Sequence, residues 1–215
     1  KDISGPDGVP DGVIDDYDKT NIGSPMPKFT FGWTNTFRYK NFDLSVFING
    51  SYGNKVYNYL SMKLTHMNSP WTNQLNAVNG RAQLVPINPN KVYEDGTMWY
   101  NDVSNVMVAN PGASIPRATI NDPNDNDRIS DRYIEDGSYI RLKNISLGYT
   151  FPKKTIDKLG LSNLRIYANI QNLLTITGYD GYDPEIGAST SSVNVYGLDN
   201  GRYPSPTVYS FGLNV

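Results

Sequence analysis

The residues best suited to chemistry in this sequence form one acidic loop near the N-terminus. The run DGVPDGVIDDYD occupies residues 7–18. A calcium loop needs oxygen ligands at near-alternate positions and a glycine where the chain turns sharply. With Gly12 at that turn, the oxygens at positions one, five, seven, nine and twelve of such a loop belong to Asp7, Asp11, the carbonyl of Val13, Asp15 and Asp18. The spacing predicts a calcium site.

Two departures from the calcium pattern keep a second interpretation open. Val9 stands where an Asp or Asn ligand is expected, and Asp18 replaces the bidentate Glu. Acidic turns rich in glycine and proline are also common in exposed loops that bind no metal. We therefore carry two alternatives, a loop ordered by Ca²⁺ and a simple acidic turn.

The composition excludes most other site chemistry. The chain has no Cys and a single His, His66, so thiolate metal sites, disulfides and a His-rich zinc site are excluded. A net charge of −2, from 19 basic and 21 acidic residues, provides no field that would attract nucleic acid. We find no catalytic carboxylate pair and no Gly-rich phosphate loop after a strand. The sequence therefore predicts neither an enzyme nor a required cofactor.

The elements that must position any site are strands, because apolar and polar residues alternate with a period of two. The first alternating segment places Phe29, Phe31 and Trp33 on one face and Thr30 and Thr34 on the other. In every segment the apolar set carries no charge. The phase slips by one residue at Asn144, which predicts a β-bulge. Strands are expected in five segments, near 28–39, 42–54, 138–151, 163–175 and 206–215.

The length of these runs and of their connections favours a membrane barrel. Each run lasts about 9–12 residues, which matches a tilted transmembrane strand and exceeds the ~5–6 residues of soluble sheets. The links at 40–41 and 152–162 are short, whereas those at 55–137 and 177–205 are long. Short turns on one side and long loops on the other are typical of outer-membrane barrels. A soluble sandwich with one wet face is the alternative.

The long loops also carry aromatic residues that could meet a ligand. Such side chains can stack on sugar rings or on peptide side chains, and packing of the loop against its neighbours is the alternative role for each. The candidates are Trp71, Trp99, Tyr100, Tyr179, Tyr182 and Tyr203.

Three stretches resemble one known family. The run DGVIDDYDKTNIGSPMPKFTFGWTNTFRYKNFDLSVFINGSYGNKVYN resembles the late-barrel segment of the SusC/RagA family of TonB-dependent outer-membrane transporters. The run DRYIEDGSYIRLKNISLGYTFPKKTIDKLGLSNLRIYANIQNLLTITGYDGYDPE is similar to the next-to-last strands of that family, and DNGRYPSPTVYSFGLNV to its closing strand. Family members often carry D-x-N-G-D-G-x-I-D where this chain has PDGVPDGVID, which weakens the calcium prediction.

The resemblance implies an all-β, antiparallel transmembrane barrel of 22 strands, of which residues 1–215 would supply about five at the C-terminal end. In the family the plug, TonB box and other N-terminal regions lie upstream, so we expect the chain to be part of a longer receptor in the bacterial outer membrane, in contact with its lipid. The family imports glycan oligosaccharides or peptides with a SusD-like surface lipoprotein as lid and with energy delivered through TonB.

Other classes of function remain as alternatives. A soluble or surface β-sandwich that binds glycan through loop aromatics is the main one. The siderophore or cobalamin branch of the same transporter superfamily is another, although the quoted runs favour the SusC-like branch over it. The uncharged band that includes Phe29, Leu44, Leu147 and Ile166 argues against the soluble module, because a soluble sheet must cover such a face.

Overall fold

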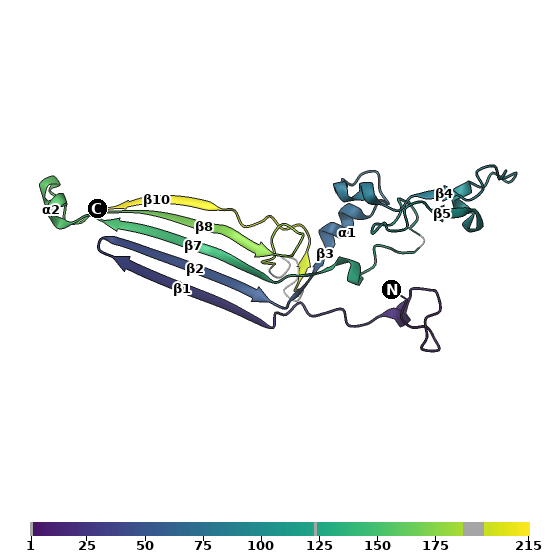
Figure 1. Cartoon of the computed structure of the whole chain (residues 1–215), viewed down its shortest axis with the longest axis horizontal. Helices are drawn as coiled ribbons and strands as arrows, with labels where there is room; N and C mark the ends of the chain where they lie inside the picture. Colours follow the sequence, from purple (N-terminus) through teal and green to yellow (C-terminus); the bar gives the residue numbers. More distant parts are fainter. Residues whose placement is uncertain (1, 123, 187–195) are drawn as a thin grey trace. The chain divides into compact units, whose positions relative to one another are not determined.

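The computed structural model describes residues 2–122, 124–186 and 196–215 (Figure 1). The chain divides into two compact units. The sheet unit comprises Ile22–Asn58 and Ile134–Val215, and the loop unit comprises Lys1–Asn21 and Tyr59–Tyr133. Among the described residues no helix combines the length and the apolar run needed to cross a membrane.

The sheet unit is built on a five-stranded antiparallel sheet in the order β1-β2-β7-β8-β10 (Figure 1). Each strand overlaps one of the segments where alternation predicts a strand. β8 runs two residues further toward the C-terminus than the expected 163–175. The strands are β1 (Phe29–Tyr39), β2 (Phe42–Tyr52), β7 (Tyr139–Thr150), β8 (Arg165–Thr177) and β10 (Val208–Asn214).

The register aligns the alternation of all five strands, so that the sheet has one apolar and one polar face. Because successive side chains of a strand point to opposite faces, paired residues share a face. One row of partners across the sheet is Phe37, Leu44, Leu147, Ala168 and Phe211. The adjacent row, one residue along each strand, is Thr36, Ser45, Ser146, Asn169 and Ser210.

The predicted bulge is present in β7. Leu142 pairs with Ile48 and Asn144 with Phe47, which leaves Lys143 as the extra residue opposite β2. The register with β8 shifts at the same point, where Asn172 has a positive φ of 52°. The irregularity resets the phase, and the apolar set of β7 therefore stays on one face along the whole strand.

The short connections lie together at one end of the sheet (Figure 1). Lys40 and Asn41 join β1 to β2. The link from β7 to β8 contains α2 (Lys153–Ile156) and the 3-10 helix η6 (Asp157–Leu159), between Pro152 as N-cap and Gly160 as left-handed C-cap. The sequence predicts this single helical turn from the same proline and glycine.

At the opposite end of the five-stranded sheet, short strands form a second, three-stranded sheet in the sheet unit. β3 (Lys55–Asn58) pairs antiparallel with β6 (Ile134–Asp136) and parallel with β9 (Leu198–Asp199). Val56 of β3 is 1% exposed and lies in the core of this region. Residues 187–195 of the expected long connection 177–205 lie outside the described residues.

The loop unit differs from the irregular connection expected over 55–137, because it carries short elements of its own. Its core contains Met62 of α1 and Tyr133 of η5, which are both 4% exposed. The elements are η1 (Asp16–Asp18), α1 (Tyr59–Thr65), η2 (Asn76–Gly80), β4 (Leu84–Pro86), η3 (Trp99–Asn101), η4 (Val103–Asn105), β5 (Val106–Val108) and η5 (Asp131–Tyr133), with β4 and β5 paired antiparallel.

Candidate functional site

The polar face of the five-stranded sheet carries a charged network centred on Arg141 of β7. The Arg141 side chain is 3% exposed, and its Nε donates to Thr175 Oγ1 of β8 at 2.8 Å. Its Nη1 donates to Glu185 Oε2 at 2.6 Å, and its Nη2 to Asp183 Oδ1. Lys143, the bulge residue, also donates to Glu185 Oε2, at 2.7 Å. The network ties the segment after β8 to the sheet.

Asp183 accepts hydrogen bonds both from the sheet, through Arg141, and from the backbone of neighbouring loop segments. Its Oδ1 accepts the Glu185 N–H at 2.9 Å, and its Oδ2 accepts the Ser205 N–H at 3.0 Å. Burial raises the pKa of Asp183, but the hydrogen bonds from Ser205, Arg141 and Glu185 outweigh it and leave the pKa below its ordinary value. Asp183 is thus kept ionised, as a buried partner of Arg141 must be.

A second ion pair on the polar face lies near the short-turn end of the sheet. Arg165 of β8 donates from Nη2 to Asp43 Oδ2 of β2 at 2.6 Å, and from Nε to Asp43 Oδ1 at 3.2 Å. The two side chains meet across β7, above Gly148. A Cβ added at Gly148 would collide with both of them, so the glycine makes this bidentate contact possible.

The acidic loop has its carboxylates turned to backbone N–H groups. Asp18 Oδ1 accepts from Ile3 at 2.6 Å and Ser4 at 3.1 Å, and its Oδ2 accepts from Asp15 at 2.9 Å. Asp11 Oδ1 accepts the Val13 N–H at 2.9 Å.

The predicted calcium ligands, including the exposed Asp7, do not converge on one point. Asp15 is the N-cap of η1 and completes a capping box with Asp18. In the described part of the chain, three or more potential ligand side chains come within 4.8 Å of one another only around His66.

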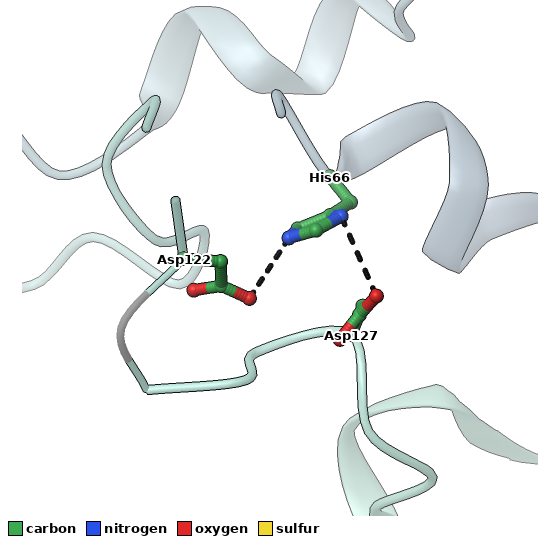
Figure 2. A group of neighbouring side chains, drawn as sticks. All are labelled: His66, Asp122 and Asp127. Carbon is green, nitrogen blue, oxygen red and sulfur yellow. Dashed lines mark hydrogen bonds and ion pairs between the residues drawn. The ribbon is translucent and has the colours of Figure 1, made fainter. Parts of the chain in front are cut away.

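His66, Asp122 and Asp127 form that other group, in the loop unit (Figure 2). His66 Nε2 lies 2.9 Å from Asp122 Oδ2, and its Nδ1 lies 3.9 Å from Asp127 Oδ2. Figure 2 shows the ring between the two carboxylates, one at each nitrogen. Asp122 also accepts the Asn126 N–H at 2.5 Å and the Asn126 side-chain amide at 2.6 Å.

This arrangement offers a metal ion too few ligands. With Asp122 engaged by His66 and Asn126, only His66 Nδ1 and the Asp127 carboxylate remain, whereas protein zinc sites use three or four side chains. We therefore assign the group a structural role: His66, directly after α1, holds Asp122 and Asp127 close to the end of that helix.

The aromatic candidates fall into two groups. Trp71, Tyr182 and Tyr203 are 93%, 64% and 84% exposed, and Tyr100 is 43% exposed beside the half-buried Trp99. Tyr179, in contrast, is 5% exposed, and its hydroxyl donates to Asp199 Oδ2 at 2.6 Å. Burial, together with the Asp199 bond, raises its pKa. Tyr179 therefore packs within the sheet unit in this structure.

The partners of Arg141 and Lys143 could not be found from the sequence. Asp183 and Glu185 lie 42 and 44 residues after Arg141. No spacing rule joins residues so far apart. The one available signal was a pair of cations in the polar set of an otherwise uncharged strand.

Comparisons with known proteins agree with this fold and sequence. No protein-family model matches the chain. TonB-dependent receptor P3 of Formosa agariphila is 35% identical over 209 residues, which are 95% of this chain and 18% of that protein. TonB-dependent receptor SusC of Bacteroides thetaiotaomicron is 28% identical over 207 residues, which are 95% of this chain and 16% of that protein.

Solved structures give the same fold. The RagAB peptide transporter matches with a TM-score of 0.64 at 20% identity, over 89% of this chain and 17% of that one. The RagAB peptide importer in the closed-closed state matches with a TM-score of 0.64 over 97% of this chain and 20% of that one. The chain spans less than a fifth of the length of the curated relatives it matches.

These matches define the class: over nearly its whole length the chain resembles a segment of the TonB-dependent receptors. Within that class it is SusC/RagA-like, as the sequence resemblance predicts.

Proposed function

We propose that this chain forms part of the C-terminal transmembrane barrel of an outer-membrane nutrient importer. The observation that carries the proposal is the uncharged face of the five-stranded sheet. Leu147, Ile166 and Phe211 lie on that face and are 47%, 44% and 81% exposed. A soluble protein rarely leaves so broad an apolar surface in water, whereas the lipid-facing side of a barrel strand requires one.

The edges of the sheet support a larger closed structure. β1 and β10 are the outer strands of the sheet order. In lipid their unpaired backbone groups have no water to bond, so membrane sheets close into barrels. We propose that further strands of the receptor pair with β1 and β10 and complete a barrel of 22 strands.

The polar face would line the interior of this barrel. Its uncharged rows and its Arg141 and Arg165 ion pairs suit contact with water and polar cargo. We propose import without covalent chemistry: loop and lumen residues bind glycan oligosaccharides or peptides, a SusD-like lipoprotein closes over them, and movement of the plug driven through TonB opens the path. RagAB, one of the structural neighbours, is described as a peptide importer.

Ordering of residues 7–18 by Ca²⁺ stays a prediction. The backbone bonds of Asp11, Asp15 and Asp18 support the simple acidic turn.

Sidedness tests the proposed function. In the whole receptor, in intact cells, a cysteine at Asn124 should react with a membrane-impermeant maleimide and one at Lys158 should not. Both positions are exposed, and the proposal puts the first outside the cell and the second in the periplasm. Labelling after outer-membrane permeabilisation is the control and should reach both. Preferential labelling of Lys158→Cys in intact cells would contradict the proposed topology.

A further inference from the structure

The loop unit contains a broad groove. It has a volume of about 900 Å³ and runs between the residues around β4, the 3-10 helix η3 and the segment 117–121. Backbone contacts hold the walls of the groove in place. Arg81 forms an isolated parallel β-bridge with Ile115, and the Ala82 N–H donates to the Ile115 carbonyl at 2.8 Å.

The groove is positively charged within a chain of net negative charge. Its lining contains Arg81 and Arg117 and no carboxylate. Within the described residues Arg117 has no hydrogen bond or ion pair, and the Arg81 guanidinium donates only to the Val78 carbonyl, from Nη1 at 3.3 Å. Two acids flank the lining in sequence, and both are engaged by other side chains: Asp102 is paired with Lys91 at 2.5 Å, and Asp122 Oδ2 lies 2.9 Å from His66 Nε2.

The uncharged part of the lining suits a ligand rich in hydroxyls. Gln83, Asn101 and Asn121 contribute side-chain amides, which both donate and accept hydrogen bonds as sugar hydroxyls require. Trp99 and Tyr100 add two aromatic rings, whose centroids lie 5.7 Å apart at 79°. Aromatic faces of this kind give a sugar ring a flat apolar surface to pack against.

We propose that this groove binds acidic oligosaccharides, with Arg81 and Arg117 holding their carboxylate or sulfate groups. A guanidinium matches both anions, because its planar N–H groups form paired hydrogen bonds to two oxygens. The inference rests on the proposed function, since it names the cargo class that the external loops of the importer would capture. An acidic peptide is the competing ligand, and it would make less use of the amides and rings.

Binding to the whole purified receptor in nanodiscs tests the inference. The probes are hexagalacturonate for carboxylates, a sulfated carrageenan hexasaccharide for sulfates, neutral maltohexaose, and hexaglutamate as the acidic peptide, each followed by isothermal titration calorimetry. We expect at least one acidic oligosaccharide to bind more tightly than maltohexaose and hexaglutamate. Whichever acidic sugar binds identifies the anion.

Variants locate the binding. R81Q and R117Q should each weaken acidic-sugar binding about 10-fold, the value of one charged hydrogen bond, and the double variant should weaken it further. Adding salt should weaken binding less in these variants than in the wild type. K63Q removes an exposed cation of the same unit outside the groove and should leave the affinity unchanged.

Three results would overturn the inference. They are no binding of either acidic sugar, the same acidic-sugar affinity in the double variant as in the wild type, or tighter binding of hexaglutamate than of both acidic sugars. The cysteine-labelling topology, measured on the same variants, keeps this test separate from the proposed function. A correctly inserted receptor that binds no acidic sugar contradicts the groove alone.

Discussion

The sheet unit and the loop unit are each stabilised internally by a different kind of interaction. In the sheet, backbone pairing joins strands of 7 to 13 residues, which leaves most side chains free to face one of two environments. In the loop unit, elements of 3 to 7 residues are joined by polar side chains that bond to distant backbone. Asn105, only 4% exposed, bonds both the N–H and the carbonyl of Asn88. The sheet therefore tolerates many changes that preserve its faces, whereas the loop unit depends on individual side chains.

The largest expected effect concerns Arg141, a buried side chain that holds the segment after β8 to the sheet. R141M leaves Asp183 buried without its cation, and removing one partner of a buried ion pair costs about 3–5 kcal/mol. The segment around Asp183 should detach from the sheet. Hydrogen exchange of the Glu185 and Ser205 amides, which donate to Asp183, should accelerate strongly. K143M removes a cation that contacts Glu185 but not Asp183 and should have a smaller effect; equal exchange in the wild type and R141M would contradict the account.

The second largest effect is a difference between the two faces of the sheet in the cost of an added charge. L147R places a charge on the apolar face and should cost about 2–4 kcal/mol if the residue lies near the bilayer midplane. S146R, one residue earlier and on the polar face, should cost far less. Folding of the receptor into lipid vesicles, followed by urea titration, measures both. Equal costs at the two positions would mean that the faces do not meet different environments.

A smaller effect is expected inside the loop unit. N105A removes two hydrogen bonds with the Asn88 backbone and one with the Tyr93 hydroxyl, and each such bond is worth about 0.5–1.5 kcal/mol. Exchange of the Asn88 amide should therefore be faster. Asn90 is exposed, and N90A serves as the control. Identical protection in both variants would show that this unit does not depend on side-chain bonds.

The smallest effect concerns the acidic loop. Hydrogen bonds from the Ile3 and Asp15 N–H groups lower the pKa of Asp18 below its ordinary value of 3.8. A lowered pKa in the folded state stabilises the loop above that ordinary value, and the stabilisation is lost as the pH falls through the folded pKa. The Ile3 amide, compared with its intrinsic exchange rate at each pH, should lose protection below about pH 4. In D18A the Ile3 amide should be unprotected at all pH values, whereas in D7A its protection should follow that of the wild type. A protected Ile3 amide in D18A would contradict the assignment.

The parts of the fold that the sequence predicts are those governed by local rules. Alternation located the strands of the large sheet, their faces and the bulge beside Asn144, because the period of two acts on neighbouring residues. Pro152 and Gly160 marked their helical turn for the same reason. β3, β4, β5, β6 and β9 span only 2 to 4 residues, too few for a period to emerge.

The site was less accessible to sequence reasoning. Arg141 with Asp183 and His66 with Asp122 come together across 42 and 56 residues, through the path of the folded chain. In the sequence nothing distinguishes Tyr179 from the exposed loop tyrosines, yet its hydroxyl donates to the buried Asp199.

The most direct test of the account is whether the apolar face meets lipid. Spin labels at L44C and S45C, adjacent residues on opposite faces of β2, would be compared in the whole receptor in lipid vesicles. The account predicts that the label at Leu44 is relaxed mainly by oxygen, which concentrates in lipid, and the label at Ser45 mainly by a water-soluble nickel complex. Equal accessibility of both labels to the nickel complex, or a protein-buried signal at Leu44, would contradict a lipid-facing sheet.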